Sequence, residues 1–475
     1  MADEHATEAL VKRIAAALQS LKPVTLPAAA ICPGYCAALG AEAANIQLDL
    51  QPAKQASSRR PRRCRGIPWS CFVSGARWCS LVQVSIVGSY TLGTACRPGA
   101  AVDVAVVLPR ACFKEKDHLN HRYHVKKALF LSHAAGLLRK ELKGMIDGVS
   151  LEVGQLPVPS LPAIRFTRRL TCVALLFASQ LLGGDPRRPC LVLQPSRAKV
   201  PSAAGLMIRL LPCAEPDTFA PARLAPGRNS LRSHADPTAA AAPKAPSSGE
   251  DAEAAAKGWL PTPHYNQSVL ADLLVTCPGS ALALAVQAAL GASPRYAEGL
   301  ILLKCWARAQ GLGGLVTGSV LAALVAHLHQ SSRLLPAMAP VQVFRAVMSF
   351  LADCSKAAPL STGFAMSRTA SAAAAPGPGV PAFAAHFPVV FVDPSGHVNL
   401  TEHWTAADRR RVQLAAMRTV PLVAAGVRAP EESFDAVFLA GRSQAAAADY
   451  AYTVRLPARN GESPGRFLQE ATVIV

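Results

Sequence analysis

The stretch VSIVGSYTLGTACRPGAAVDVAVVLP, residues 84–109, predicts two buried strands joined by a glycine-containing turn. The first strand ends at Gly88 and Ser89, and the second contains Asp103 and Ala105. Because side chains alternate along a strand, those of Asp103 and Ala105 lie on one face of the sheet. The backbone N–H groups and hydroxyl of a Gly-Ser turn suit a phosphate, and a carboxylate suits a cation. The stretch therefore predicts an α/β fold with a polar site at the turn.

This arrangement resembles the signature of polymerase-β-type nucleotidyltransferases. In those enzymes the Gly-Ser turn holds a triphosphate, the next strand carries two acids one residue apart, and a later strand carries a third acid. The resemblance implies phosphate binding by Gly88 and Ser89 and a vestigial metal ligand in Asp103. Ala105 stands where the second acid belongs, and a methyl group cannot coordinate Mg²⁺, which requires oxygen ligands. We therefore expect no catalytic residue here.

Two further residues are candidates for this site. Glu152, in the predicted strand GVSLEVG, is either the third acid or an exposed strand residue, and we favour the second interpretation. Residues 299–328, GLILLKCWARAQGLGGLVTGSVLAALVAHL, resemble the helical domain of the poly(A) polymerase and oligoadenylate synthetase superfamily. In that superfamily the lysine of a Lys-x-Trp helix faces the nucleotide phosphates. Lys304 is the equivalent residue, and a solvated helix lysine is the alternative.

Other stretches resemble one branch of this superfamily, the Nrap family of nucleolar RNA-associated proteins. They are CFKEKDHLNHRYHVKKALFLSHAAGLL, IRLLPCAEPDTFAPARLAPGRNSLR, PTPHYNQSVLADLL and FPVVFVDPSGHVNL. With gaps, the resemblance covers residues 82–456. It implies a polymerase-β-like nucleotidyltransferase domain with a mixed sheet, followed by a mainly helical poly(A) polymerase-like domain.

Membership of this family implies a function in the nucleolar small-subunit processome, in the maturation of pre-18S rRNA. The expected role is a non-catalytic scaffold that binds pre-rRNA and processome proteins in the nucleus and nucleolus, with no cofactor, no membrane and no small-molecule substrate. One alternative is an active template-independent RNA nucleotidyltransferase that uses Asp103 and Glu152 with Mg²⁺. Another is a pseudoenzyme that binds nucleotide at Gly88 and Ser89 without turnover. The methyl group of Ala105 favours the scaffold.

Composition and patterning divide the chain into five parts. We expect an N-terminal helix and basic arm over residues 1–80, a nucleotidyltransferase-like domain over 81–232 with an insertion at 155–186, an Ala/Pro/Ser-rich linker at 233–258, a helical domain over 259–456 and a tail at 457–475. Because family members are much longer, we expect the chain to be an N-terminal fragment. The segments 56–80 and 155–186 have no recognised family counterpart, which leaves lineage-specific insertion and retained non-coding sequence as alternatives.

The chain is strongly basic, with a formal net charge of +19, and this favours a polyanionic partner such as nucleic acid. A long helix is predicted at about residues 116–143. It carries the candidate RNA-binding side chains, which are His118, Arg122, Lys126, Lys127, Arg139 and Lys140. The first three recur every four residues and so share one face, where they suit phosphate contacts. The alternative is a solvated face opposite the apolar stripe.

No metal site is expected. Thirteen cysteines at irregular spacing, after an acidic and polar N-terminus, indicate reduced thiols in an intracellular compartment. Cys32 and Cys36 lack a second pair at zinc-ribbon spacing. His118, His121 and His124 recur every three residues without an acid or cysteine to complete a site, so a polar helix face is the favoured interpretation.

Overall fold

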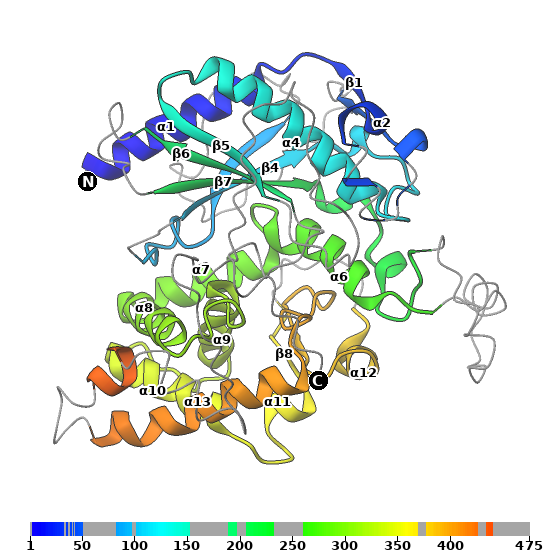
Figure 1. Cartoon of the computed structure of the whole chain (residues 1–475). Helices are drawn as coiled ribbons and strands as arrows, with labels where there is room; N and C mark the ends of the chain where they lie inside the picture. Colours follow the sequence, from blue (N-terminus) through cyan, green and yellow to red (C-terminus); the bar gives the residue numbers. More distant parts are fainter. Residues whose placement is uncertain are drawn as a thin grey trace, which may run out of the picture.

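The structure is a computed structural model, and it describes residues 2–32, 35–36, 39, 41, 43–50, 82–96, 101–152, 189–196, 206–231, 260–368, 377–425 and 434–439. A five-stranded sheet with its covering helices forms one part of the molecule, and a bundle of helices lies beneath the sheet (Figure 1). The segment 56–80, the insertion at 155–186, the linker at 233–258 and the tail at 457–475 lie outside the described residues.

Five strands form the mixed sheet that the resemblance implies. They are β3 (Gln83–Val87), β4 (Ala101–Leu108), β5 (Ile146–Glu152), β6 (Cys190–Pro195) and β7 (Met207–Ala214). Their order across the sheet is β3-β4-β7-β6-β5. β4 and β7 run parallel, and the other neighbours run antiparallel. The strand with Asp103 therefore lies between the strand that ends in the Gly-Ser turn and a strand from much later in the chain.

Two long helices cover the upper face of the sheet. α1 (Ala2–Gln19) and α4 (Arg122–Glu141) pack against each other over the strands (Figure 1). Alternation along β4 turns Val102, Val104 and Val106 toward this layer, where they join its hydrophobic core. The layer is completed by β1 (Val24–Pro27), α2 (Ala28–Ile31), η1 (Ala43–Asn45) and β2 (Gln47–Leu50). The N-terminal helix is thus part of the first core.

α4 begins at Arg122, later than the expected residue 116. Asn120 and His121 adopt φ values of 51° and 60°, in the left-handed region. An α-helix of L-residues cannot continue through such a conformation. Residues 114–121 therefore form turns that fold back beside the first turns of α4, and short 3₁₀ helices flank the same region at η3 (Arg110–Cys112), η7 (Pro216–Thr218) and η8 (Pro221–Leu224).

The helices beneath the sheet bury a second core. The longer elements are α6 (Pro263–Ala271), α7 (Ala281–Ala292), α8 (Pro294–Ala309), α9 (Gly318–Gln330), α10 (Pro340–Ala352) and α13 (Ala406–Ala425). The shorter ones are the π-helices η10 (Asp272–Thr276) and η11 (Asp435–Leu439), α11 (Pro359–Thr362), α12 (Gly379–Ala384), and the paired strands β8 (Phe364–Ala365) and β9 (Phe391–Val392). The buried indole of Trp306 donates through Nε1 to Thr419 Oγ1 at 2.8 Å, which ties α8 to α13.

Of these helices, α6 packs into the upper core and not into the second core. Tyr265 and Leu270 join the cluster built by α1 and α4, whereas the lower cluster begins at Leu282. The linker expected at residues 233–258 lies before α6. The two cores therefore divide at η10, later in the chain than the composition indicates.

Within the described residues, no single helix is both long enough and apolar enough to cross a membrane. One bent pair, Pro263–Thr276 with Ala281–Ala292, reaches that length and composition across a 47° bend.

Candidate functional site

The turn after β3 is held in place by its own backbone. Gly88 has a φ of 76°, and a Cβ added to it would lie 3.1 Å from Asp103 Oδ2. The left-handed φ and the close contact both favour glycine. Ser89 O accepts hydrogen bonds from Thr94 N at 2.9 Å and from Thr94 Oγ1 at 3.5 Å. The expected phosphate turn therefore lies directly against Asp103, with Gly88 exposed to solvent.

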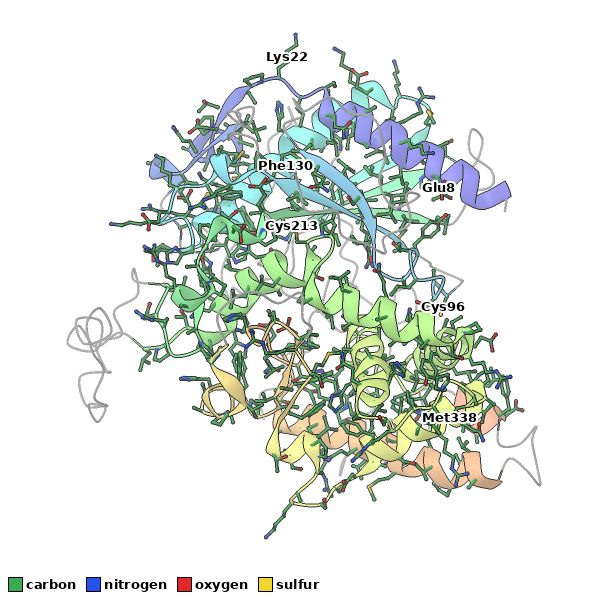
Figure 2. All side chains as sticks on the ribbon, turned by 180° about the vertical axis from the view of Figure 1, so that it is seen from behind. Glu8, Lys22, Cys96, Phe130, Cys213 and Met338 are labelled. Atoms are coloured by element: carbon green, nitrogen blue, oxygen red, sulfur yellow. The ribbon has the colours of Figure 1, made fainter. Side chains whose placement is uncertain are left out.

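The strand position of the missing acid, Ala105, is buried among apolar side chains. Ala105 is fully buried in a cluster with Val107, Cys213 and Cys277. Figure 2 shows Cys213 where the sheet faces the helices. None of these four side chains offers the oxygen ligand that Mg²⁺ requires. The missing acid at position 105 is therefore not replaced from within its own cluster.

Arg209 occupies both oxygens of the Asp103 carboxylate. The two residues face each other across the parallel pair of β4 and β7, so their side chains share a face. Arg209 Nε donates to Oδ1 at 2.7 Å and Nη2 donates to Oδ2 at 3.0 Å, a bidentate pair. The side chains are only 14% (Asp103) and 23% (Arg209) exposed. The acid that the resemblance implies as a metal ligand is thus neutralised by a cation of the same chain.

Sequence reasoning did not find Arg209. Its one available signal was a single charged residue in the otherwise apolar strand MIRLLPCA. The pairing of β4 with β7 joins residues far apart in sequence, and only that register shows which residue Arg209 faces.

Glu152 does not lie beside Asp103. It belongs to β5, at the opposite end of the strand order from β3, whereas Asp103 belongs to β4. The register runs from Asp103 to Arg209, then to Val192 and Ser150 on β6 and β5. Three inter-strand steps amount to roughly 14 Å. The hypothesis that Asp103 and Glu152 hold one Mg²⁺ is therefore wrong, because two ligands of one ion lie within a few ångströms of it.

Lys304 reaches from α8 to the turn after β3. Its Nζ donates to Thr94 O at 2.7 Å and to Thr94 Oγ1 at 3.0 Å. Burial lowers the pKa of Lys304, while the neighbouring Cys96, Asp103 and Cys305 act in the opposite direction. Among the described residues, no carboxylate forms an ion pair with this ammonium. Lys304 is therefore a half-buried cation with two neutral acceptors, unlike the solvated helix lysine of the alternative interpretation.

The N-terminus of α9 lies against Lys304. A Cβ on Gly318, the first residue of α9, would come within 3.1 Å of Lys304 Cε. Thr317 caps the helix, since its Oγ1 accepts from Val320 N at 3.4 Å. A helix N-terminus carries partial positive charge. The Gly-Ser turn, Lys304 and this terminus therefore form a continuous region that suits an anion.

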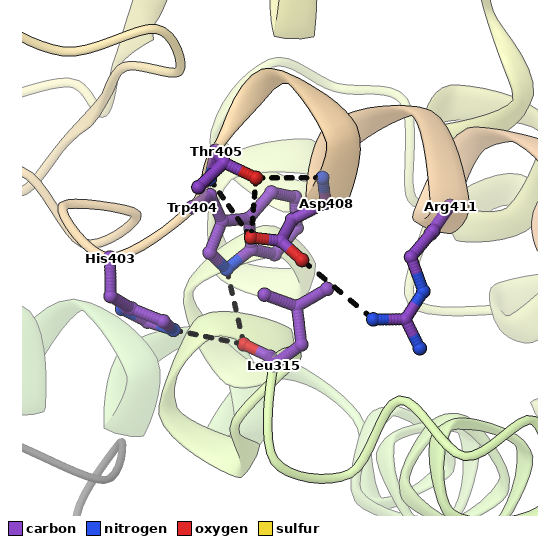
Figure 3. Close-up of polar contacts among 6 residues, drawn as sticks. All are labelled: Leu315, His403, Trp404, Thr405, Asp408 and Arg411. Atoms are coloured by element: carbon purple, nitrogen blue, oxygen red, sulfur yellow. Dashed lines mark hydrogen bonds and ion pairs between the residues drawn. The ribbon is translucent and has the colours of Figure 1, made fainter. Parts of the chain in front are cut away.

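The backbone carbonyl of Leu315 holds the loop before α9 in place through contacts with two side chains (Figure 3). Leu315 O lies 3.1 Å from His403 Nε2 and accepts from Trp404 Nε1 at 3.1 Å. Next to them, Thr405 and Asp408 cap the start of α13, with Thr405 N donating to Asp408 Oδ2 at 3.0 Å and Asp408 N donating to Thr405 Oγ1 at 3.1 Å. The contacts of Leu315 tie the loop before α9 to the segment that leads into α13.

Three of the six candidate RNA-binding residues are buried. Lys126 Nζ lies 2.7 Å from Asp117 Oδ2 and donates to Cys112 O at 2.8 Å. Lys127 forms a buried ion pair with Asp272. The expectation that His118, Lys126 and Lys127 lie on a solvent-facing basic surface is therefore wrong. The turns of residues 114–121 cover this side of α4, and η10 supplies the partner of Lys127.

The remaining three candidates lie at opposite ends of α4. Arg122 is partly exposed at the first residue of α4, whereas Arg139 and Lys140 lie in its last turn, about 25 Å away. Lys140 is exposed, and so is Lys143 just beyond the helix. The exposed positive charge on α4 is therefore concentrated at its C-terminal end.

The histidines and cysteines singled out for metal binding are buried. His121 and His124 pack against Tyr265 of α6, with ring centroids 4.9 and 5.4 Å from its ring, so the polar helix face expected for them is wrong. Cys32 and Cys36 lie in the upper core. In the part of the chain that the structure describes, no group of three metal-binding side chains is present.

Comparison with protein families gives two matches. The family described as "Nrap protein domain 1" matches residues 77–156 and 171–283, and "Nrap protein PAP/OAS-like domain" matches residues 295–441. The chain belongs to the Nrap family. Together with the mixed sheet and the helices beneath it, these matches support a nucleotidyltransferase-like fold.

Curated relatives extend the Nrap assignment. Nucleolar protein 6 of Mus musculus is 32% identical over 345 residues, and that of Homo sapiens is 31% identical over 348 residues. Each alignment covers 72% of this Nrap chain and 25% of the relative, so the chain spans about a quarter of the length of these relatives. Their name agrees with the nuclear and nucleolar location that the resemblance implied.

Among solved structures, the Nrap chain is similar to "Structure of E. coli MS115-1 CdnC:HORMA-deltaN complex", with 14% identity and a TM-score of 0.40. That match covers 77% of this chain and 83% of the other.

Proposed function

We propose that this chain is a non-catalytic scaffold of ribosome biogenesis, which binds pre-rRNA and protein partners in the small-subunit processome of the nucleolus. Its polymerase-β-like nucleotidyltransferase domain and its helical, poly(A) polymerase-like domain serve as binding platforms. The nucleolar name of the relatives supports the setting. The observation that carries the non-catalytic role is the bidentate pair of Arg209 and Asp103.

The pair supports this role because metal-dependent nucleotidyl transfer needs free carboxylate oxygens. Two metal ions in such a site are held by acids that share a face of the sheet. In this chain Arg209 uses both oxygens of Asp103, and Ala105 offers only a methyl group. A metal ion that approached Asp103 would meet the positive charge of the guanidinium on both carboxylate oxygens.

An extension assay tests the absence of catalysis. The purified chain is incubated with labelled NTPs, an RNA primer, and Mg²⁺ or Mn²⁺. We expect no extension above the protein-free reaction, and the same result for Asp103→Ala. Extension by the wild-type chain that disappears in Asp103→Ala would overturn the scaffold.

Retained phosphate binding without turnover is a second candidate function. The half-buried ammonium of Lys304, without a carboxylate partner among the described residues, favours it. This candidate would be supported if ATP raised the melting temperature of the wild-type chain without any primer extension. The same rise should be lost in Lys304→Met. No shift in the wild-type chain would exclude it.

We place RNA contact at the C-terminal end of α4, at Arg139, Lys140 and Lys143. Replacing all three with glutamine should weaken RNA binding and reduce the slope of log affinity against log salt by roughly 2, since each lost phosphate contact removes about 0.7. The matched control replaces Arg345, Lys356 and Arg410, exposed cations of the helical part, with glutamine. Equal slopes for both triple variants would remove this surface from consideration.

A further inference from the structure

A pocket opens among the helices that lie furthest from the sheet. Its volume is about 460 Å³, within the range of roughly 300–1,000 Å³ that is usual for small-ligand sites. The end of α9, the helix α10 and the segment that leads into α11 surround it (Figure 1). Its polar and aromatic lining comprises Arg333, Ser349, Phe350, Asp353 and Ser355. The pocket is therefore separate from the candidate phosphate site, which lies between the β3 turn and α8.

A tight turn after α9 places Arg333 in the wall of this pocket. Ser332 has a φ of 57°, in the left-handed region that residues other than glycine rarely adopt. The turn brings Arg333 N to 2.9 Å from Leu328 O, near the end of α9. Arg333 Cζ lies 5.9 Å from the centroid of the Phe350 ring, a cation–π distance. The wall therefore combines a planar cation with an aromatic ring.

Asp353 brings the opposite charge to the same pocket. It directly follows α10, and Gln413 Nε2 of α13 donates to its backbone carbonyl at 2.8 Å. Ser355 N donates to Asp353 Oδ1 at 2.9 Å, and the hydrogen bonds from Ser355 lower the pKa of Asp353, so its carboxyl group is ionised at neutral pH. In the part of the chain that the structure describes, no ion pair joins Asp353 to Arg333. The pocket therefore offers a cation and an anion to a ligand.

We propose that this pocket binds a guanine base of single-stranded RNA, an inference that rests on the proposed binding of pre-rRNA. Unstacked RNA bases bind against aromatic rings and guanidinium groups and form hydrogen bonds along their edges. Guanine is the RNA base that carries both an acceptor pair, O6 and N7, and a donor pair, N1–H and N2–H₂. The guanidinium of Arg333 suits the acceptor pair, and the carboxylate of Asp353 suits the donor pair. The hydroxyls of Ser349 and Ser355 suit the ribose.

Fluorescence anisotropy with two labelled pentanucleotides, UUGUU and UUAUU, tests the proposal. The wild-type chain should bind UUGUU about tenfold more tightly, because a bidentate contact discriminates strongly against the wrong base. Asp353→Asn and Arg333→Lys should each lose most of this preference, since each removes one of the two paired contacts. Arg345→Gln is the matched control, because it removes an exposed cation of α10 outside the pocket lining, and it should keep the preference.

Competition with free nucleosides separates this pocket from the region around Lys304. Guanosine has no phosphate for Lys304 to bind, so it should displace UUGUU from the wild-type chain and from Lys304→Met alike, whereas adenosine should not. Equal affinity for the two pentanucleotides, in a wild-type chain that binds RNA, would overturn the guanine pocket and leave the scaffold role intact. A wild-type chain that binds no RNA even at low salt would overturn both proposals.

Discussion

Replacing Asp272 with alanine should lower the free energy of unfolding by about 3–5 kcal/mol, the cost of leaving a buried charge without its partner. Lys127 and Asp272 are only 2% and 5% exposed. Lys127 lies on α4 in the upper core, and Asp272 is the first residue of η10, where the two cores divide. The substitution therefore strands an ammonium in the interior at the junction of the two parts.

Urea denaturation measures this effect, and the chain supplies a matched control. Arg223 and Glu115 form an ion pair of 2.7 Å, but their side chains are 48% and 74% exposed. Glu115→Ala should therefore change the free energy of unfolding by no more than about 1 kcal/mol. The double variant Lys127→Met, Asp272→Leu should recover much of the lost stability, because it removes both charges. If Asp272→Ala lowered the free energy of unfolding by no more than Glu115→Ala does, that result would contradict the buried ion pair.

Replacing Arg209 with aspartate should make the stability of the chain depend on a divalent metal. The substitution puts a second carboxylate opposite Asp103 on the neighbouring strand. Two carboxylates about 5 Å apart repel by roughly 3 kcal/mol at an effective dielectric constant of 20. Mn²⁺ between them removes the repulsion, so the melting temperature should fall without metal and recover with it.

Arg209→Gln is the control for this experiment, since it removes the guanidinium without adding an acid. Its melting temperature should fall relative to the wild-type chain, because Asp103 loses its partner, and Mn²⁺ should restore little of it. If Arg209→Asp melted at the same temperature with and without Mn²⁺, Asp103 would not be positioned to hold a cation even when freed of Arg209.

The local pattern of the sequence predicted much of the fold. The predicted strand, turn and strand are present as β3, the turn at Gly88 and β4. A Gly-Ser turn signal and runs of valine determine local backbone conformation, so they could be recognised in the sequence. The Lys-x-Trp helix is present as α8, with Trp306 in the lower core. These features depend on residues close together in sequence, so they could be read from it.

Features that depend on long-range packing could not be read in this way. The periodicity of the predicted helix put His118, Arg122 and Lys126 on one basic face, but Asp117 in the turns of residues 114–121 pairs with Lys126, which is buried. Lys127 is likewise buried, against Asp272 of the π-helix η10. The left-handed φ values of Asn120 and His121 make the helix begin at Arg122, later than its pattern indicates. In each case the deciding partner lies in another element, and the sequence of α4 alone carries no record of it.

Long-range strand pairing also determined which residues of the candidate site could be predicted from the sequence. The loss of the second acid could be predicted from the sequence, because Ala105 and Asp103 lie on the same strand. Arg209 and Glu152 could not be placed, because their distances from Asp103 depend on the strand order β3-β4-β7-β6-β5. That order puts an arginine opposite Asp103 and leaves Glu152 three strands away.

Electron paramagnetic resonance of Mn²⁺ added to the wild-type chain and to Asp103→Asn tests most directly whether Asp103 can hold a metal. With its carboxylate bound by Arg209, both proteins should give the same signal from free Mn²⁺ across the titration. One equivalent of Mn²⁺ bound by the wild-type chain and lost in Asp103→Asn would contradict the account.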